Sequence, residues 1–204
     1  IDYGVQRGVE FAIGHSGASY DKVIQAANSG VRQSTHTFNG MQGLHHRKPG
    51  TVGGILTDNR IYAQIISDGV HLHPATVKLV VLAKGIRRTI LITDSVRAAG
   101  LEDGSYDLGE LQITVKNGVA RIASGSLAGS TLTMDKAVRN VMQLANLSFK
   151  DAVTMATYVP AEAMRILNNK GYIKVGADAD LTFFDKEHHV AATMANGEFV
   201  YKNF

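Results

Sequence analysis

The chain has 204 residues, of which 45% are hydrophobic, and this is enough to bury a core in one or two domains. It contains no cysteine, so disulfides and thiolate metal ligands are excluded, and any metal must be bound by His, Asp or Glu. The formal net charge of +3 comes without a long basic run or a long apolar segment, so we expect a cytoplasmic protein with neither a nucleic-acid partner nor a membrane span.

Each of four short apolar runs in the first half of the chain is followed by an ionisable side chain. Residues 10–13 precede His15, 31–35 precede His36, 62–67 precede Asp68 and His71, and 89–93 precede Asp94. Runs of this length that are rich in β-branched residues predict buried strands, and the helical patterns between them predict a parallel sheet. Catalytic groups of (β/α) barrels lie at the C-terminal ends of the strands, so these side chains are the first candidates for a site.

The segments between these strands carry signals for helix ends and for one long loop. Ser19 is a predicted N-cap, and Gly30 fits the position that follows the same helix. His73 and Pro74 predict the start of another helix. Residues 37–53 are predicted to form a glycine-rich connection, and long loops of compact domains are typically binding loops or lids.

The second half of the chain changes to hairpins, helices and a β-rich tail. Residues 110–123 predict a hairpin around a type I′ turn at Asn117-Gly118. One helix is predicted through residue 145, a second begins after Ser148, and a short third one starts at Pro160. The tail is predicted to contain strands at residues 172–175, 180–184, 190–195 and 199–202, with a turn at Asn196-Gly197.

These elements predict an α/β fold: the C-terminal half of a (β/α)8 TIM barrel, with four βα units, plus part of a small β-sandwich domain. Residues 1–170 are assigned to the barrel half, including a hairpin insertion near 107–124, and residues 171–204 to the sandwich. A complete barrel needs about 250 residues, and half of one leaves two open parallel edges. Because the chain also begins at Ile1 and not at Met, we expect it to be the C-terminal half of a larger enzyme.

The polar residues at the strand ends suggest metal-assisted chemistry. His15 and His36 are candidate ligands of one divalent ion such as Zn²⁺, because their interval suits neighbouring strand ends and not one helix. Asp94 is a candidate base for water whose pKa the metal lowers. The alternatives are that each histidine is a structural hydrogen-bonding group and that Asp94 caps a helix.

Two glycine-rich loops are candidates for binding an anion. Arg47 lies in the first loop, where it is either a phosphate clamp or a solvated surface side chain. Residues 125–130 precede a helix and either hold an anion on backbone N–H groups or form a simple turn into that helix.

Six short motifs lie at residues 14–16, 35–41, 47–50, 67–71, 92–94 and 127–130. In this order they resemble N-acetylglucosamine-6-phosphate deacetylases of the amidohydrolase superfamily, and the resemblance covers essentially the whole chain. Residues 175–181 resemble the return of such chains into the small β-sandwich of the superfamily. One departure is Ser95, where family members commonly carry Ala.

The resemblance implies a role for each candidate residue. It implies metal binding by His15 and His36, with Zn, Fe, Mn, Co or Ni as the divalent ion, and general acid/base catalysis by Asp94. It implies substrate contacts by Asn39, Gly40, Arg47 and His71, and a backbone wall of the sugar pocket at Leu127, Ala128 and Gly129. It also implies a homodimer in which Arg47 reaches the neighbouring site, and a Glu ligand and a carbonyl-polarising His that precede Ile1.

The activity that the resemblance implies is removal of the acetyl group from N-acetylglucosamine 6-phosphate, giving glucosamine 6-phosphate and acetate in amino-sugar catabolism. One alternative is another amidohydrolase activity, such as a dihydroorotase-like ring opening or a D-amino-acid deacylation. A third possibility is an inactive fragment that retains sugar-phosphate binding.

Overall fold

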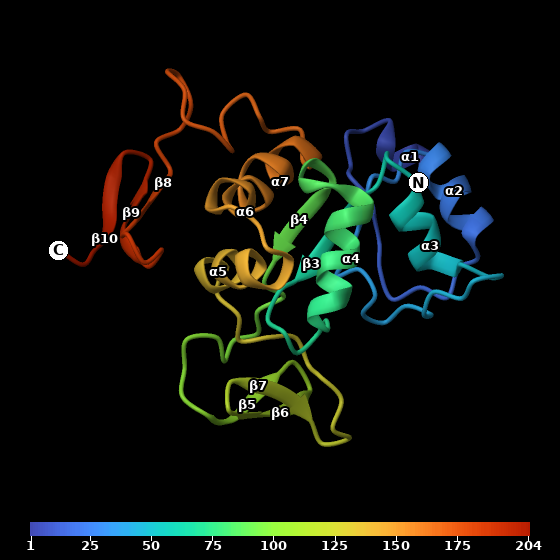
Figure 1. Ribbon diagram of the computed structural model, residues 1–204, viewed down its shortest axis with the longest axis horizontal. Coiled ribbons are helices and arrows are strands. Elements are labelled where there is room, and N and C mark those ends of the chain that lie inside the picture. Colours follow the sequence, from blue (N-terminus) through green and yellow to red (C-terminus); the bar gives the residue numbers. More distant parts are fainter.

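A four-stranded parallel sheet forms the centre of the computed structural model, which describes residues 1–204 (Figure 1). The strands are β1 (Ala12–Ile13), β2 (Gln33–Ser34), β3 (Tyr62–Ile66) and β4 (Thr89–Ile92). They lie side by side in the order β1-β2-β3-β4, so each strand pairs with the next one along the chain. The parallel sheet and its four strands were predicted from the sequence, although β1 and β2 are shorter than the apolar runs that contain them.

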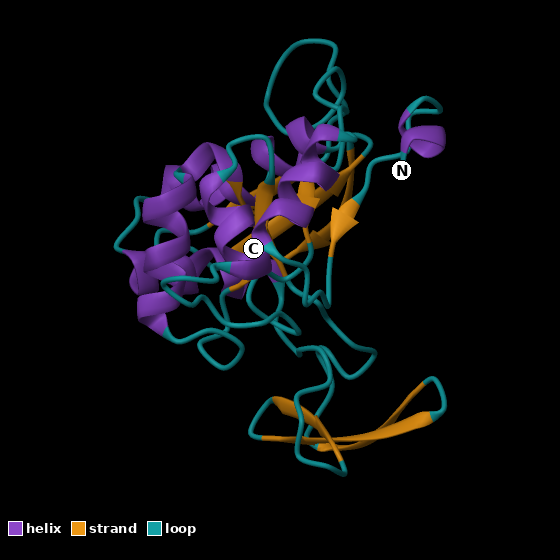
Figure 2. Cartoon of the chain, turned by 90° about the vertical axis from the view of Figure 1, so that its right-hand side faces the viewer, coloured by secondary structure: helices purple, strands orange, loops and turns teal.

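Helices follow the strands and cover the sheet, most of them from one side (Figure 2). They are α1 (Asp2–Val5), α2 (Tyr20–Asn28), α3 (Gly50–Thr57), α4 (Pro74–Lys84), the 3-10 turn η1 (Ile86–Arg88), α5 (Met134–Ala145), α6 (Phe149–Ala156) and α7 (Tyr158–Ala163). None of these helices has the length and the apolar character needed to cross a membrane.

The helix starts follow from local sequence. The hydroxyl of Ser19 accepts a hydrogen bond from the N–H of Lys22, and the hydroxyl of Ser148 accepts one from the N–H of Asp151. His73 caps α4 through its ring, and Pro74 occupies the first helical position, where a missing N–H costs nothing. These three predicted helix starts are confirmed.

The main core lies between the sheet and the helices on that side. Ala63 and Leu91 are fully or almost fully buried there, among side chains of α2 to α6. Because successive side chains of a strand point to opposite faces, Tyr62 and Ile90 point the other way and pack against α7.

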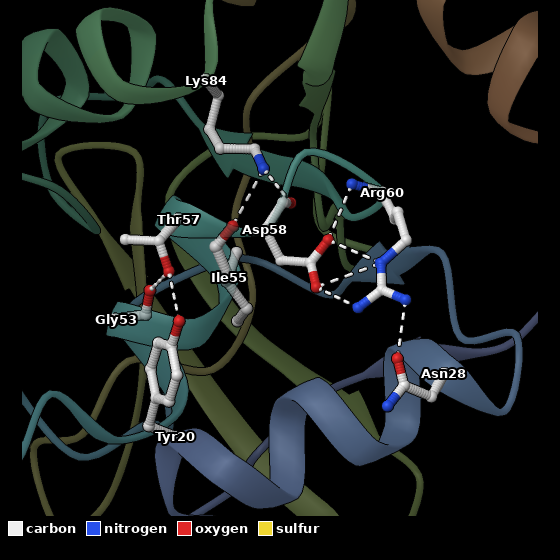
Figure 3. Close-up of polar contacts among 8 residues, drawn as sticks. All are labelled: Tyr20, Asn28, Gly53, Ile55, Thr57, Asp58, Arg60 and Lys84. Carbon is white, nitrogen blue, oxygen red and sulfur yellow. Dashed lines mark hydrogen bonds and ion pairs between the residues drawn. The ribbon is translucent and has the colours of Figure 1, made fainter.

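Polar contacts connect the ends of α2, α3 and α4, as Figure 3 shows. The ammonium group of Lys84 donates to the carbonyl oxygens of Ile55 (2.9 Å) and Asp58 (2.7 Å). Arg60 forms an ion pair with the carboxylate of Asp58 at 2.5 Å and donates to Asn28 at 2.7 Å. These contacts satisfy carbonyl groups at the C-terminal end of α3, which a helix end otherwise leaves unpaired.

Two small antiparallel sheets complete the chain. The first contains β5 (Gly104–Leu108), β6 (Leu111–Lys116) and β7 (Val119–Ile122), and it stands beyond the C-terminal ends of β3 and β4 (Figure 1). Asn117 (φ 51°) and Gly118 (φ 71°) form its tight turn, with the two positive φ angles of the predicted type I′ turn. The second sheet contains β8 (Leu181–Phe184), β9 (Val190–Ala195) and β10 (Glu198–Lys202).

The structure corrects three of the predicted elements and adds one strand that was not predicted. Residues 172–175 form no strand, because the alternating apolar side chains Ile173 and Val175 are 89% and 98% exposed and have no partner strand. The long connection ends at Gly50, where α3 begins. Pro160 is the third residue of α7 and not its first. β5 was not predicted and adds a third strand to the hairpin.

Candidate functional site

The residues that follow three of the parallel strands have an unusual backbone. His15 (φ 44°), His36 (φ 28°) and Asp94 (φ 50°) all have positive φ angles, which non-glycine residues rarely adopt. Strained backbone of this kind costs about 1–3 kcal/mol per residue and is concentrated at functional sites. The structure therefore marks as unusual the same three positions that the sequence marked as candidate metal ligands and catalytic base.

The two histidines converge on one point. Their Nε2 atoms are 3.0 Å apart, and their ring centroids are 4.7 Å apart with the rings nearly perpendicular. His36 is 7% exposed, whereas His15 is exposed. Adjacent parallel strands β1 and β2 place them there, since each histidine lies just beyond the C-terminal end of its strand.

The loop after His36 holds this pair in place. Gly40 has a φ of 63°, and a Cβ atom there would lie 2.5 Å from Nδ1 of His15, so only glycine fits against the ring. The backbone N–H of Asn39 donates to the carbonyl oxygen of His36 at 2.9 Å, and its side-chain amide donates to the same oxygen at 3.4 Å. Asn39 and Gly40 thus lie against the backbone of one histidine and the ring of the other.

The pair fits part of a divalent metal site. Two imidazole nitrogens that face one point are a common zinc ligand arrangement, but such sites usually have at least three protein ligands. Nowhere in the structure do three or more His, Cys, Asp or Glu side chains gather closely enough to hold a metal. Nδ1 of His36 is also buried without a hydrogen-bond partner, although metal-binding histidines normally donate from their second nitrogen.

Asp94 lies against the chain segment that contains Gly129. The N–H of Ser130 donates to the carbonyl oxygen of Asp94 at 2.8 Å, and the N–H of Val96 donates back to Ser130 at 2.9 Å. Gly129 has a φ of 61°, and a Cβ atom there would lie 2.8 Å from the Asp94 carbonyl oxygen and 3.9 Å from its Oδ2. No helix follows Asp94, so the alternative that it caps a helix is wrong.

In the segment 125–130, three backbone N–H groups form hydrogen bonds within the chain. The N–H groups of Gly125, Ala128 and Ser130 donate to the carbonyl oxygens of Ile122, Ala120 and Asp94. The next helix, α5, begins only at Met134. These three N–H groups are not available to an anion, and the interpretation of the loop as an anion cradle stays a prediction.

A cavity of about 240 Å³ lies between the C-terminal end of β3, the turn of the hairpin and the start of α5. His71 and Gly129 line it, together with Asn117, Lys136 and Asn140. The cavity thus brings together two predicted substrate-binding residues from distant parts of the chain.

His71 is held in this cavity wall by Asp68. Nδ1 of His71 is 2.6 Å from Oδ2 of Asp68, and both side chains are largely buried. Burial raises the pKa of Asp68, but hydrogen bonds from the His71 ring and from the N–H groups of His71 and Val70 outweigh it, so the pKa lies below its usual value. Asp68 was noted as an ionisable residue at a strand end but was assigned no role, and the signal for its pairing is its spacing of three residues before His71.

Arg47 lies apart from the other candidates. It is exposed in the loop before α3, and its guanidinium group donates to Nε2 of His46 at 2.7 Å. It forms no ion pair with any carboxylate of the chain. The geometry leaves open both interpretations of Arg47, as a phosphate ligand or as a solvated side chain.

The chain matches the model of the amidohydrolase family over residues 5–200. It belongs to the amidohydrolase family. It is 39% identical to an N-acetylglucosamine-6-phosphate deacetylase of Vibrio furnissii, over 98% of this chain and 50% of the relative. It is also 39% identical to an N-acetylgalactosamine-6-phosphate deacetylase of Escherichia coli O157:H7, over 95% of this chain and 51% of the relative.

A solved amidohydrolase has the same fold over the matched part. The crystal structure of an N-acetylglucosamine-6-phosphate deacetylase from Thermotoga maritima superposes with a TM-score of 0.94 at 36% identity, over 98% of this chain and 55% of that chain. The resemblance found in the sequence is confirmed by these relatives. The chain spans about half the length of each of them.

Proposed function

We propose that this chain provides the C-terminal half of a metal-dependent deacetylase, with its parallel sheet forming half of a (β/α)8 barrel. The enzyme would remove the acetyl group from N-acetylglucosamine 6-phosphate and release glucosamine 6-phosphate and acetate. The observation that carries the proposal is the pair of histidines with Nε2 atoms 3.0 Å apart, in a chain 39% identical to a deacetylase of this specificity. This similarity favours the deacetylase over a dihydroorotase-like or D-amino-acid deacylase activity.

His15 and His36 would hold a divalent ion, with Zn²⁺ or one of Fe, Mn, Co and Ni as the candidates. When bound, such an ion supplies a Lewis acid that lowers the pKa of water and polarises a carbonyl group. Gly40 keeps the ring of His15 in the orientation that ligation needs, because its missing side chain leaves room for Nδ1.

Asp94 would transfer the proton in this reaction. Hydrolysis of an amide requires a base that takes a proton from the attacking water and an acid that gives a proton to the leaving nitrogen. The Asp94 carboxylate is exposed and forms no ion pair, so it is free to do both in turn. Its strained backbone fixes the side chain beside Gly129.

The sugar would occupy the cavity that His71 and Gly129 line, with Leu127 and Ala128 extending the same wall. Arg47 would bind the phosphate group, since guanidinium and phosphate form paired hydrogen bonds. Arg47 is exposed on a loop, and this supports a homodimer in which it reaches the site of the neighbouring subunit. A cytoplasmic homodimer remains the predicted assembly and location.

N-acetylgalactosamine 6-phosphate is a second candidate substrate. The Escherichia coli relative named for that sugar is as similar to this chain, at 39% identity, as the Vibrio furnissii relative. Acetate release from the two sugar phosphates, compared under the same conditions, decides between them.

The proposal is tested with Asp94→Asn in an active form of the enzyme. Because the chain spans half of its relatives, that form is a chimera in which residues 1–204 follow the N-terminal half of the Vibrio furnissii enzyme. We expect Asp94→Asn to lower kcat by about 10²–10⁴-fold, the usual contribution of general acid–base catalysis, with metal content unchanged. Near-full kcat in the variant would rule out the role of Asp94, and an inactive chimera with bound sugar phosphate would favour the non-enzymatic alternative.

A further inference from the structure

The turn between β3 and α4 is organised by one carboxylate. Oδ1 of Asp68 accepts hydrogen bonds from the N–H groups of Val70 and His71, both at 2.8 Å. Oδ2 faces Nδ1 of His71 at 2.6 Å. A single side chain thus fixes the backbone of the turn and the ring of its last residue.

Burial and charge determine which ring nitrogen of His71 carries a proton. The side chains of His71 and Asp68 are only 6% and 14% exposed, so water does not compete effectively for their contact. The ring and backbone donors hold the pKa of Asp68 below its usual value, so its carboxylate is ionised and only accepts hydrogen bonds. Nδ1 of His71 must therefore be the donor.

The other ring nitrogen of His71 has no partner in the protein. Nε2 takes part in none of the side-chain hydrogen bonds, and it is not among the fully buried unpaired atoms. His71 lines the cavity between β3, the hairpin turn and α5, and the other polar residues of the lining are Asp68, Asn117, Ser130, Thr131, Lys136 and Asn140. Nε2 is thus the atom of the ring that is available to a ligand there.

We propose that Asp68 is a positioning residue that keeps a proton of His71 on Nδ1, so that the ring in its neutral form presents Nε2 as a hydrogen-bond acceptor to a ligand hydroxyl. The identity of that ligand, an amino-sugar phosphate, rests on the proposed function. The tautomer itself does not, because it follows from contacts within the chain.

Asp68→Asn reverses this arrangement with little change in shape. The amide oxygen of Asn can still accept from the two backbone N–H groups, so the turn is kept. Its NH₂ group then faces Nδ1 as a donor, which requires Nδ1 to be unprotonated and moves the ring proton to Nε2. Nε2 of His71 would then be a hydrogen-bond donor to the ligand, whereas it is an acceptor in the wild-type chain.

The chain contains a matched control pair. Oδ1 of Asp185 accepts from the N–H of His189 at 2.7 Å, and Oδ2 lies 3.5 Å from Nδ1 of the same histidine. This pair is 40% and 63% exposed in the turn between β8 and β9, away from the cavity. Asp185→Asn therefore makes the same chemical change without touching the proposed ligand site.

The test uses ¹⁵N-labelled histidine in the 204-residue chain and long-range ¹H–¹⁵N spectra at a pH about two units above the ordinary histidine pKa of about 6.5. We expect His71 to carry its proton on Nδ1 in the wild type and in Asp185→Asn, and on Nε2 in Asp68→Asn. A wild-type His71 protonated on Nε2 would overturn the proposal, as would an unchanged tautomer in a folded Asp68→Asn chain.

Titration with glucosamine 6-phosphate gives the second readout. We expect Asp68→Asn to weaken binding about threefold to tenfold, the value of one neutral hydrogen bond, and Asp185→Asn to leave it unchanged. Equal affinity of Asp68→Asn and wild type would contradict the proposed acceptor role. If the wild-type sequence, in the chimera with the N-terminal half of the Vibrio furnissii enzyme, binds no glucosamine 6-phosphate, the proposed function fails at this site, while the tautomer measurement still decides the role of Asp68.

Discussion

At the scale of single residues, His36 is one of two residues with a buried side-chain atom that has no hydrogen-bond partner, and Glu10 is the other. The ring is 7% exposed, yet its Nδ1 atom is buried without a hydrogen-bond partner. A buried polar group left unpaired costs about 1–3 kcal/mol, and native structures rarely retain such a group without a functional reason. An unpaired second ring nitrogen is expected of a metal-binding histidine whose hydrogen-bond partner lies in another segment of the enzyme.

Arg47→Ala tests the proposed phosphate contact. Arg47 has no carboxylate partner in the chain, so its removal should leave the fold intact. A charge-assisted hydrogen bond contributes about 1.5–3 kcal/mol, which corresponds to about a tenfold to hundredfold loss in affinity. We expect KM to rise by that factor for N-acetylglucosamine 6-phosphate in the active chimera, and to change little for N-acetylglucosamine.

The neighbouring cation gives the control for this experiment. Lys48 is exposed in the same loop, and Lys48→Ala removes the same charge without removing a guanidinium group. Equal KM increases on both sugars would show that Arg47 is structural. If Arg47 acts across a dimer, a mixture of Arg47→Ala and Asp94→Asn subunits should be more active at low substrate concentration than the two variants measured separately, because some hybrid sites would contain both residues.

Among the polar residues of the site, some contacts could be predicted from the sequence and others could not. His15 and His36 were predicted because both follow β-branched runs, and the structure brings their Nε2 atoms together. Asp68 was a candidate only by its position at a strand end, and its role was not predicted, because the sequence gives no sign that its carboxylate faces the ring of His71. That contact depends on the turn conformation, which the two backbone hydrogen bonds to Asp68 create.

At the scale of elements, the helix starts that depend on neighbouring residues were predicted correctly. The helix α3, which depends on tertiary packing, was not predicted. Ser19, His73 and Ser148 each cap a helix, because a cap depends on a few neighbouring residues. α3 was missed because its glycines have low helix propensity. A Cβ atom on Gly54 would lie 2.7 Å from Val23 of α2, so these glycines allow two helices to approach closely, and this tertiary packing outweighs propensity.

The last residue of α4, which contacts the end of α3, is the one lysine of the chain that is nearly inaccessible to solvent. Lys84 is 6% exposed, and burial lowers its pKa from 10.5 to about 8, although the nearby Asp58 opposes the shift (Figure 3). A lysine whose pKa is lower in the folded state than in the unfolded chain binds its proton more weakly after folding. It therefore opposes folding below pH 8, and this penalty is relieved as the pH rises from 8 towards 10.5.

Lys84→Met should remove this pH dependence. We expect the free energy of unfolding of the wild-type chain, relative to Lys84→Met, to rise by about 2 kcal/mol between pH about 7.5 and about 9.5. Urea unfolding at the two pH values measures the difference. Lys78→Met, at an exposed position of the same helix, should show no such change. A wild-type chain and a Lys84→Met chain that respond equally to pH would show that Lys84 is not desolvated.

At the scale of the whole molecule, the parallel sheet is open at both edges. β1 and β4 each pair with one neighbouring strand only, and parallel sheets are normally covered and closed. The chain also spans about half the length of its relatives. Both observations, together with the unpaired Nδ1 of His36, support the proposal that further strands of a barrel pack against these edges.

Metal binding by the chain alone and by the chimera tests this proposal. A catalytic zinc site usually has three protein ligands, and under the proposed function this chain would contribute two, the imidazoles of His15 and His36. We therefore expect the 204-residue chain alone to bind Zn²⁺ weakly and to release no acetate from N-acetylglucosamine 6-phosphate. In the chimera with the N-terminal half of the Vibrio furnissii enzyme, metal content and acetate release should appear together, and His36→Ala should abolish both. Tight binding of one metal per chain by residues 1–204 alone, with turnover, would show that the half-barrel interpretation is wrong and that another residue here, such as His71, is the third ligand.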